Sequence, residues 1–307
     1  MTRVLVQRLA HTLLVLLAVS GLAFLFSHLS GDPVDMMLPP DATEQHRQEM
    51  RAALGLDQPL PVRYAKFLNL VAHGNFGFSF RYRQPALSLV LARLPASLLL
   101  ISSSLLVAVI VAIPVGLLSA YYRDSVIDRA GMAMVLLGQS VPVFWSGILL
   151  IFVFAVMLNL LPAGGYGAWR NLILPVITLA VYTAATTTRL SRSSGLDALA
   201  RDFIKTARAK GLSERLVVMK HLLRNVLIPV VTVMGVEFGV LVGGAVITER
   251  VFAWPGAASL LVEAIRNLDV PLVQACVFVL AAIVTLVNFL VDLLYSVIDP
   301  RIRLVAN

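Results

Sequence analysis

Few residues of this chain have the types and the spacing that chemistry requires. The sequence has no G-x-x-x-x-G-K-[ST] motif for the phosphates of ATP and no G-x-G-x-x-G motif for a dinucleotide. Its five histidines are scattered, without an H-E-x-x-H motif or a Cys/His pair at ligand spacing. Gly138-Gln139-Ser140 lacks the second glycine of a nucleophile elbow. The sequence therefore predicts no catalytic residue, no metal site and no enzymatic activity in this chain.

Glu237 is the one ionisable residue placed well inside a long apolar stretch. Gly235, Gly239 and Gly243 surround it four residues apart, a small-xxx-small pattern that predicts a close helix-packing face. At 100° per residue, Glu237 lies about 160° from the mean direction of these glycines. Its carboxyl group should therefore face a partner subunit, a transport pathway or another helix. A protonated or hydrogen-bonded glutamate that holds two helices together, here called a lock, is favoured over a glutamate that contacts a transported solute.

The segment 189–225 is unusually basic for a connection between two apolar stretches, with nine Lys and Arg in 37 residues. Within it, residues 202–211 are predicted to form a short helix that Gly211 ends. A second helix is predicted to start at Ser213-Glu214 and to continue to Pro229. The bland interpretation is a solvated basic loop. Nucleic-acid binding is disfavoured, because Phe203 is the only aromatic residue of the loop that could stack on a base.

The elements that position these residues must be membrane helices. The chain has 307 residues, of which 59% are hydrophobic and 14% charged, with a mean hydropathy of +0.86. These values exclude a soluble enzyme, a disordered chain and a disulfide scaffold, and the single Cys276 cannot form an internal disulfide. We predict an all-α membrane protein with a single domain over 1–307.

Six apolar stretches are long enough to cross a bilayer core of about 30 Å. They are predicted at about 9–30, 95–118, 131–160, 171–188, 226–248 and 270–291. A signal peptide is the alternative for the first stretch, but its apolar run is too long and no cleavage site follows. Pro142, preceded by Gln139 and Ser140, predicts a kink in the third span, either as a packed bend or as a gate.

The net charge of +8 follows from the distribution of basic residues among the loops. The segments on the side of both termini hold 15 Lys and Arg, and those on the other side hold 10. Seven of these ten lie in the long loop 32–93, where charge has little weight. Both termini are therefore predicted to be cytoplasmic and the loop 32–93 external. Short helices are expected within that loop at Thr43–Leu54 and Tyr64–Ala72.

Several motifs together resemble the permease subunits of ABC importers, in the branch that takes up dipeptides, oligopeptides, glutathione and nickel. The resemblance covers nearly the whole chain. It is carried by DFIKTARAKGLSERLVVMKHLLRNVLIPVVT (202–232), GDP (31–33), LGLDQPL (54–60), GNFGFSF (74–80), VGGAVITERVFAWPG (242–256), LDVPLVQA (268–275) and DLLYSVIDPR (292–301). Two departures are Lys205-Thr206-Ala207, where the general importer motif has a glutamate before two alanines, and Ala257-Ala258, where a further glycine is usual.

The resemblance implies a multi-pass subunit of the bacterial inner membrane that is not itself an enzyme. It would pair with a second, homologous permease, with two ATPase subunits and with a soluble solute-binding protein. ATP and Mg would be bound by the ATPases, so no cofactor is expected here, and no nucleic-acid partner. The short basic helix corresponds to the coupling helix that docks on an ATPase. Its expected contact residues are Asp202, Thr206, Ala207, Arg208, Ala209, Lys210 and Gly211.

The same resemblance gives expectations for the pathway and the external surface. Gln139, Pro142 and Glu237 are the candidates for the translocation pathway or its gate. Trp254, Pro255 and Gly256 are candidates for an external platform for the binding protein, with a turn packed on its own subunit as the alternative. Arg192 and Arg201 are assigned to charge balance alone.

The expected solute is a peptide or a peptide-like compound such as glutathione. Nickel or a metal chelate is the alternative, because LPAGGYGAWRNLILP (161–175) resembles the nickel members. A stand-alone channel or secondary carrier is the distant alternative. It is disfavoured because ionisable residues are almost absent from the spans.

Overall fold

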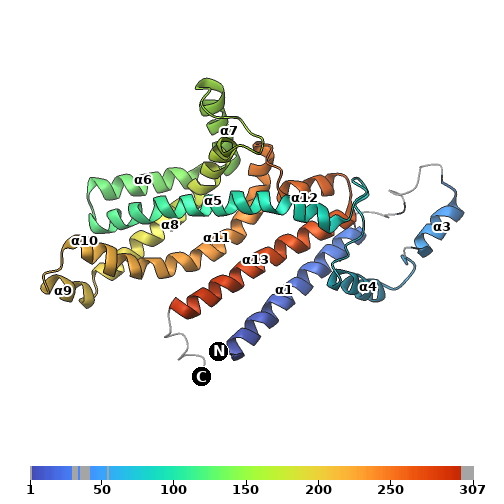
Figure 1. Cartoon of the computed structure of the whole chain (residues 1–307), viewed down its shortest axis with the longest axis horizontal. Helices are drawn as coiled ribbons and strands as arrows, with labels where there is room; N and C mark the ends of the chain where they lie inside the picture. The colour runs from blue at the N-terminus through green and yellow to red at the C-terminus, as the bar shows by residue number, and fades with distance from the viewer. Residues whose placement is uncertain (1, 30–33, 35–41, 54, 299–307) are drawn as a thin grey trace. The chain divides into compact units, whose positions relative to one another are not determined.

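The computed structural model describes residues 2–29, 34, 42–53 and 55–298 of the chain. These residues are almost entirely helical (Figure 1), as the sequence predicts. They form two compact units, the first over Met1–Pro95 and Gly256–Leu286 and the second over Ala96–Pro255 and Val287–Asn307. The single domain expected from the sequence stays a prediction.

Among the described residues, five helices are long and apolar enough to cross a membrane. They are α1 (Thr2–Leu29), α5 (Ala86–Tyr121), α8 (Trp169–Leu199), α11 (Leu223–Val251) with the short segments before it, and α13 (Val270–Ile298). A sixth span requires α6 (Val126–Ser140) and α7 (Val143–Leu150) with the π-helix η1 (Ile151–Met157), which together are bent by 101°. The helices α5, α8 and α11 extend beyond the predicted spans. The predictions covered the apolar stretches alone, and the flanking polar residues are helical as well.

Unit 1 contains α1, α3 (Glu44–Ala53), α4 (Leu60–Ala72) and α12 (Ala257–Arg266), with the first part of α5 and most of α13. The two short helices predicted in the loop 32–93 are thereby confirmed. The helix α4 is fixed to α1 by Tyr64, whose hydroxyl donates to the Leu17 carbonyl at 3.1 Å. The motif at Gly31–Pro33 and the last part of the motif 292–301 lie outside the described residues.

Asp269 joins two motifs of unit 1 that lie far apart in the sequence. Its fully buried carboxylate accepts hydrogen bonds from the Ser79 hydroxyl and, at 3.2 Å, from the backbone N–H of Arg81. Its other oxygen accepts at 3.4 Å from the N–H of Leu272, in the first turn of α13. A carboxylate at a helix N-terminus satisfies donors that have no partner within the helix. Asp269 thus ties the segment 74–80 to the segment 268–275.

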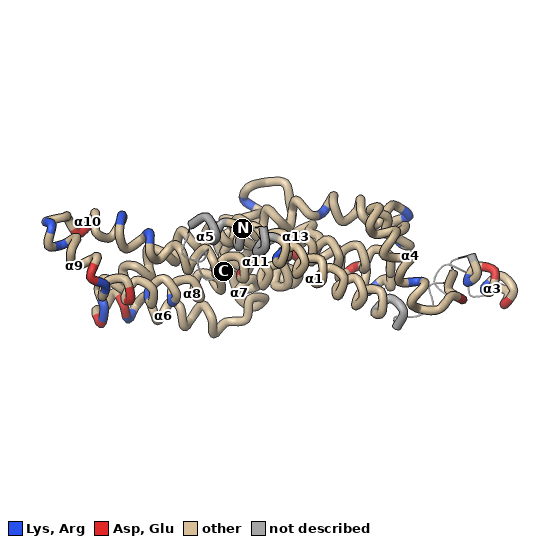
Figure 2. The backbone as a smooth tube through the Cα atoms, turned by 90° about the horizontal axis from the view of Figure 1, so that it is seen from below, with Lys and Arg blue, Asp and Glu red and all other residues tan. Residues whose placement is uncertain are grey.

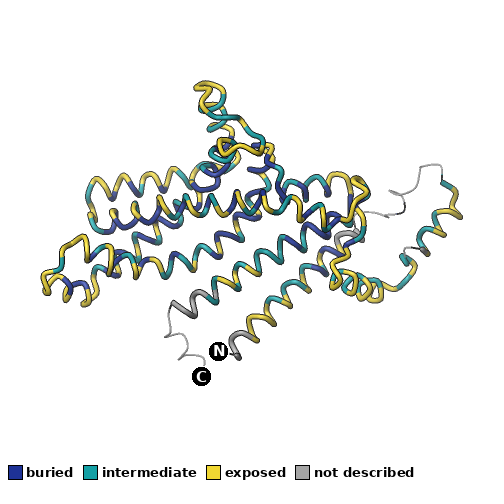
Figure 3. Tube along the Cα trace, in the orientation of Figure 1, coloured by how far each residue is buried: buried dark blue, intermediate teal, exposed yellow. Residues whose placement is uncertain are grey.

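The helix α8 lies at the centre of unit 2 and packs against α6, α7 and α11. Its buried face is rich in hydroxyl groups. Thr178, Thr187 and Thr188 each donate to the carbonyl four residues earlier, at 2.7–2.8 Å. Because these hydroxyls are satisfied within their own helix, α8 can be polar and still be buried in a membrane protein. Figure 3 shows buried positions along the facing sides of α5, α8 and α11.

Candidate functional site

The basic loop 189–225 folds into the two helices that the sequence predicts. The first, α9, spans Asp202–Ala209, and the second begins with α10 (Glu214–Leu216) and continues through the π-helix η2 (Val217–Leu222) into α11. Pro229 lies inside α11 and does not end it. In Figure 2 many charged residues of unit 2 gather around α9, α10 and the start of α6, and the spans between carry few charges.

Gly211 ends α9 in the left-handed conformation, with φ of 74°. Its N–H donates to the carbonyl of Arg208 at 2.9 Å, and the N–H of Leu212 donates to the carbonyl of Ala207 at 3.3 Å. This pair of bonds is the Schellman motif, in which a residue without a Cβ atom is strongly preferred. The predicted helix stop is confirmed, and it leaves the end of α9 as a compact, exposed knob.

The faces of α9 separate the predicted coupling residues into two groups. Ile204 and Ala207 are buried against Val217 of η2. Ala207 therefore holds α9 on its own chain and cannot touch a partner, which corrects its expected place in the contact surface. The other six residues expected there are exposed, namely Asp202, Thr206, Arg208, Ala209, Lys210 and Gly211.

Arg208 connects α9 to two other helices. Its guanidinium makes a two-pronged ion pair with Glu214 of α10, at 2.8 and 3.1 Å. The same carboxylate accepts a hydrogen bond at 3.0 Å from the hydroxyl of Tyr121, the last residue of α5. The hydrogen bond with Glu214 raises the pKa of Arg208 above its usual value. An exposed pair adds little stability, but its geometry fixes the direction of α9 relative to α5 and α10.

Pro142 lies at the bend of 101° between α6 and the segment formed by α7 and η1. The helix α6 ends at Ser140, and α7 starts one residue after Pro142, which has an extended backbone. Near this bend, the side-chain amide of Gln139 donates to the hydroxyl of Thr186 on α8 at 3.2 Å. The predicted kink is therefore present, and Gln139 fixes the end of α6 to α8. A role of Gln139 and Pro142 in the pathway stays a prediction.

Glu237 also faces α8. Its side chain is buried beside Thr183, one helical turn before Thr186. Neither Glu237 Oε2 nor Thr183 Oγ1 has a hydrogen-bond partner among the described residues. A carboxyl group inside a membrane bundle is costly and usually faces the bundle interior. The lock between α11 and α8 and the contact with a solute both stay predictions.

Replacement of Glu237 separates these two interpretations. Glu237→Gln keeps the size and hydrogen-bonding capacity of the side chain, so we expect unchanged thermal stability and unchanged uptake. Glu237→Ala removes both and should cost about 1–3 kcal/mol of stability. Leu227→Ala is the matched control, because this side chain of the same helix is 37% exposed and has no assigned role. Thermal unfolding and uptake by the purified complex measure the effects. Lost uptake in Glu237→Gln at unchanged stability would instead place the carboxyl group in the pathway.

The predicted glycine face of α11 is only partly a contact within this chain. A Cβ atom on Gly235 would lie 3.0 Å from Val291 of α13, so this glycine allows close helix packing. Gly239 is half-buried, and a Cβ atom on Gly243 would meet no atom within 4 Å. A close contact within this chain is shown for Gly235, and the packing role expected for Gly239 and Gly243 stays a prediction.

The turn after α11 is packed inward rather than exposed. Trp254 is 2% exposed, and its indole N–H donates to the carbonyl of Ala96 at 2.9 Å. Its ring makes an edge-on contact with Tyr166, with centroids 4.9 Å apart. Gly256 is also buried, and Pro255 is half-buried. The expected platform is thus wrong for Trp254 and Gly256, whose burial fits the alternative of a turn packed on its own subunit.

Sequence reasoning missed one pair of charged residues. Arg192, assigned to charge balance, makes a two-pronged ion pair with Asp128, and that assignment is wrong. Asp128 follows Ser125 at a helix start, where an acidic residue is usually a local cap. No spacing in the sequence relates it to Arg192, 64 residues later.

Within the described ranges, the structure shows no group of three or more His, Cys, Asp or Glu side chains that could hold a metal ion. The candidate site of this chain therefore consists of the coupling loop and the polar contacts of α6 and α11 with α8.

Comparison with known proteins gives consistent matches. Residues 112–304 match the family described as "Binding-protein-dependent transport system inner membrane component", and residues 1–101 match its N-terminal region. The glutathione transport system permease protein GsiC of Salmonella paratyphi A is 42% identical over 298 residues, which cover 97% of both chains. GsiC of Escherichia coli K12 is 41% identical over 299 residues, covering 97% of this chain and 98% of the relative.

Solved structures show the same fold. An inward-facing structure of the MetNI methionine ABC transporter matches with a TM-score of 0.56 and 21% identity. The match covers 69% of this chain and 96% of the matched chain.

Proposed function

The chain belongs to the family of binding-protein-dependent transport system inner membrane components, and from this premise we propose that it forms half of the pathway for a peptide-like solute. As a member of this family it is a multi-pass permease subunit of an ATP-driven importer in the bacterial inner membrane. The proposed class of solute is supported by one observation: the chain is 42% identical, over 97% of both chains, to a permease named for glutathione transport. Dipeptides and oligopeptides share the amide and carboxylate chemistry of glutathione.

Members of this family work with an ATPase and a solute-binding protein. The proposed complex contains this chain, a second homologous permease, two ATPase subunits that bind ATP and Mg, and one binding protein. The exposed knob of α9 supports an ATPase contact on this chain. An exposed apolar stripe of α11 supports a position beside the pathway or the second permease. It consists of Val236, Val240, Gly243 and Ile247.

The proposed orientation puts both termini and the coupling loop in the cytoplasm. The excess of Lys and Arg on that side supports it. A cysteine introduced at residue 60 should then react with a membrane-impermeant reagent added to intact cells. A cysteine that does not react would contradict the proposed orientation and indicate the opposite one.

Uptake by reconstituted complexes tests the proposed solute. The chain is combined in vesicles with its partner permease, the ATPases and the binding protein, and labelled glutathione, a dipeptide, an oligopeptide or nickel is supplied. We expect ATP-dependent uptake of at least one of the three peptide-like compounds. Vesicles without the binding protein are the control. Uptake of nickel alone would assign the chain to the metal-carrying alternative, and uptake without ATP would indicate a secondary carrier.

A further inference from the structure

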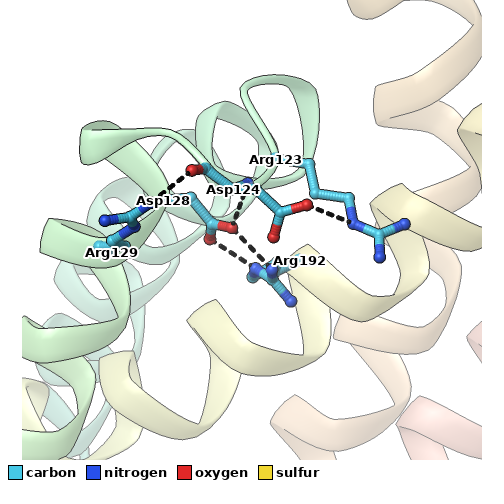
Figure 4. Close-up of polar contacts among 5 residues, drawn as sticks. All are labelled: Arg123, Asp124, Asp128, Arg129 and Arg192. Atoms are coloured by element: carbon cyan, nitrogen blue, oxygen red, sulfur yellow. Dashed lines mark hydrogen bonds and ion pairs between the residues drawn. The ribbon is translucent and has the colours of Figure 1, made fainter.

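The start of α6 is joined to α8 by a closely fitted ion pair (Figure 4). The guanidinium of Arg192 contacts both oxygens of Asp128, at 2.6 and 2.7 Å. The Asp128 side chain is 5% exposed and that of Arg192 is 25% exposed. Backbone N–H of Asp124 donates to the same carboxylate at 3.0 Å. Two parallel bonds give an arginine–carboxylate pair a fixed geometry, so the pair sets the position of α6 on α8.

The turn that carries Asp128 is itself held in one shape. Asp124 has φ of 61°, and its carbonyl accepts a hydrogen bond from Arg129 at 3.3 Å. Its carboxylate pairs with Arg123 at 3.3 Å. The Ser125 hydroxyl accepts from the N–H of Asp128 at 3.4 Å, which caps α6. Asp128 is therefore presented to Arg192 by a rigid turn.

Three glycines next to the ion pair bring α5, α6 and α8 into close contact. A Cβ atom on Gly116 of α5 would lie 2.5 Å from the Ser191 side chain and 3.0 Å from the backbone nitrogen of Arg192. A Cβ atom on Gly195 of α8 would lie 2.8 Å from Ala120 of α5. On Gly131 of α6 it would lie 2.6 Å from the Ser119 hydroxyl. Helices that approach this closely cannot slide past one another without separating.

The helix α8 leads directly into the coupling loop. It ends at Leu199, and α9 begins at Asp202. A displacement of α9 must therefore act on α8 two turns beyond Arg192. At its other end, α6 leads into the bend at Pro142, where Gln139 again contacts α8.

We infer that Asp128 and Arg192 are positioning residues of the transport cycle, which pass the movement of the coupling loop from α8 to α6. This inference rests on the proposed coupling function of α9. The ion pair holds α6 and α8 in one register, so both helices move together when an ATPase displaces α9. Without it, α6 follows α8 only through the packing on α5 and the contact of Gln139, so the bend between α6 and α7 follows ATP hydrolysis less closely.

The test compares uptake with ATP hydrolysis in the complete reconstituted complex. Asp128→Asn and Arg192→Gln should each leave assembly and basal ATPase activity within about twofold of the parent. Each should lower the solute taken up per ATP by about tenfold, within the usual range of coupling between two sites. Arg192→Lys keeps the charge without the two-pronged geometry and should give an intermediate ratio. Arg189→Gln is the matched control: the same loss of charge on α8, one turn before Arg192, on an exposed side chain.

The double variant Asp128→Asn/Arg192→Gln tests the pairing itself. Its uptake per ATP should be no lower than that of either single variant, because the two residues act through one contact. The inference is overturned if uptake and hydrolysis fall in proportion to the amount of assembled complex, which indicates a purely structural pair. The inference is also overturned if the loss of uptake per ATP in the double variant equals the product of the losses in the two single variants. Gly211→Asp is measured in parallel: if it uncouples the complex and Asp128→Asn does not, only this inference fails. If neither uncouples, the proposed coupling function of α9 fails too.

Discussion

Gly211→Asp should separate ATP hydrolysis from solute uptake while leaving the membrane spans folded. Gly211 has φ of 74°, which costs a residue with a Cβ atom about 1–2 kcal/mol. This strain opposes the two hydrogen bonds that end α9, so the exposed knob loses its fixed shape. The new carboxylate also changes the charge of a surface that otherwise presents Arg208 and Lys210. We expect uptake per ATP to fall by about tenfold or more.

Ala209→Trp should have a similar effect by a different route. Ala209 is exposed at the end of α9, between two cationic residues. A small residue there lets the backbone of α9 approach a partner closely, and an indole ring prevents this approach. Solute-stimulated ATPase activity, uptake and the amount of bound ATPase in reconstituted complexes measure both variants.

Two controls make the result specific to the coupling loop. Gly167→Asp introduces at least as much backbone strain, because Gly167 has φ of 109°, and a Cβ atom there would also meet no atom within 4 Å. Gly167 lies in the turn before α8, at the opposite end of that helix from α9. Arg201→Ala removes an exposed charge next to α9. Both should leave uptake per ATP unchanged. Normal coupling in Gly211→Asp and Ala209→Trp would reduce the loop to a basic connector.

Trp254→Ala should destabilise unit 2 by about 3–5 kcal/mol, the usual cost of truncating a large buried aromatic residue. The change removes the edge-on contact with Tyr166 and leaves the carbonyl of Ala96 without the indole donor at 2.9 Å. Trp254→Phe keeps a ring without the donor and should lose less. The melting temperature of the purified complex reports the effect.

Trp169→Ala is the matched control for this change, because Trp169 is 75% exposed. Its melting temperature should be close to that of the parent. If Trp254→Ala instead kept its melting temperature and lost only the uptake that depends on the binding protein, the residue would be a docking contact. That outcome would restore the external platform predicted from the sequence.

Local patterns in the sequence were enough to predict that the helices exist and where some of them end. Long apolar stretches must become helices in a membrane, because in a helix each backbone group finds its hydrogen-bond partner within the same segment. The stop at Gly211 and the bend at Pro142 were also readable, since a positive φ and a missing N–H are properties of single residues. The short helices α3 and α4 follow from local pattern in the same way.

The tertiary structure decided which face of each helix meets another helix. Neighbours that are distant in the chain determine several features. They bury Ala207 and Trp254, leave Gly243 exposed and place Glu237 beside α8. The pairing of Asp128 with Arg192 spans 64 residues and follows no repeat or spacing. Local rules fix the backbone of a helix, but contacts between helices depend on how complete side-chain surfaces fit together. That fit is set by the fold as a whole and is absent from any single segment.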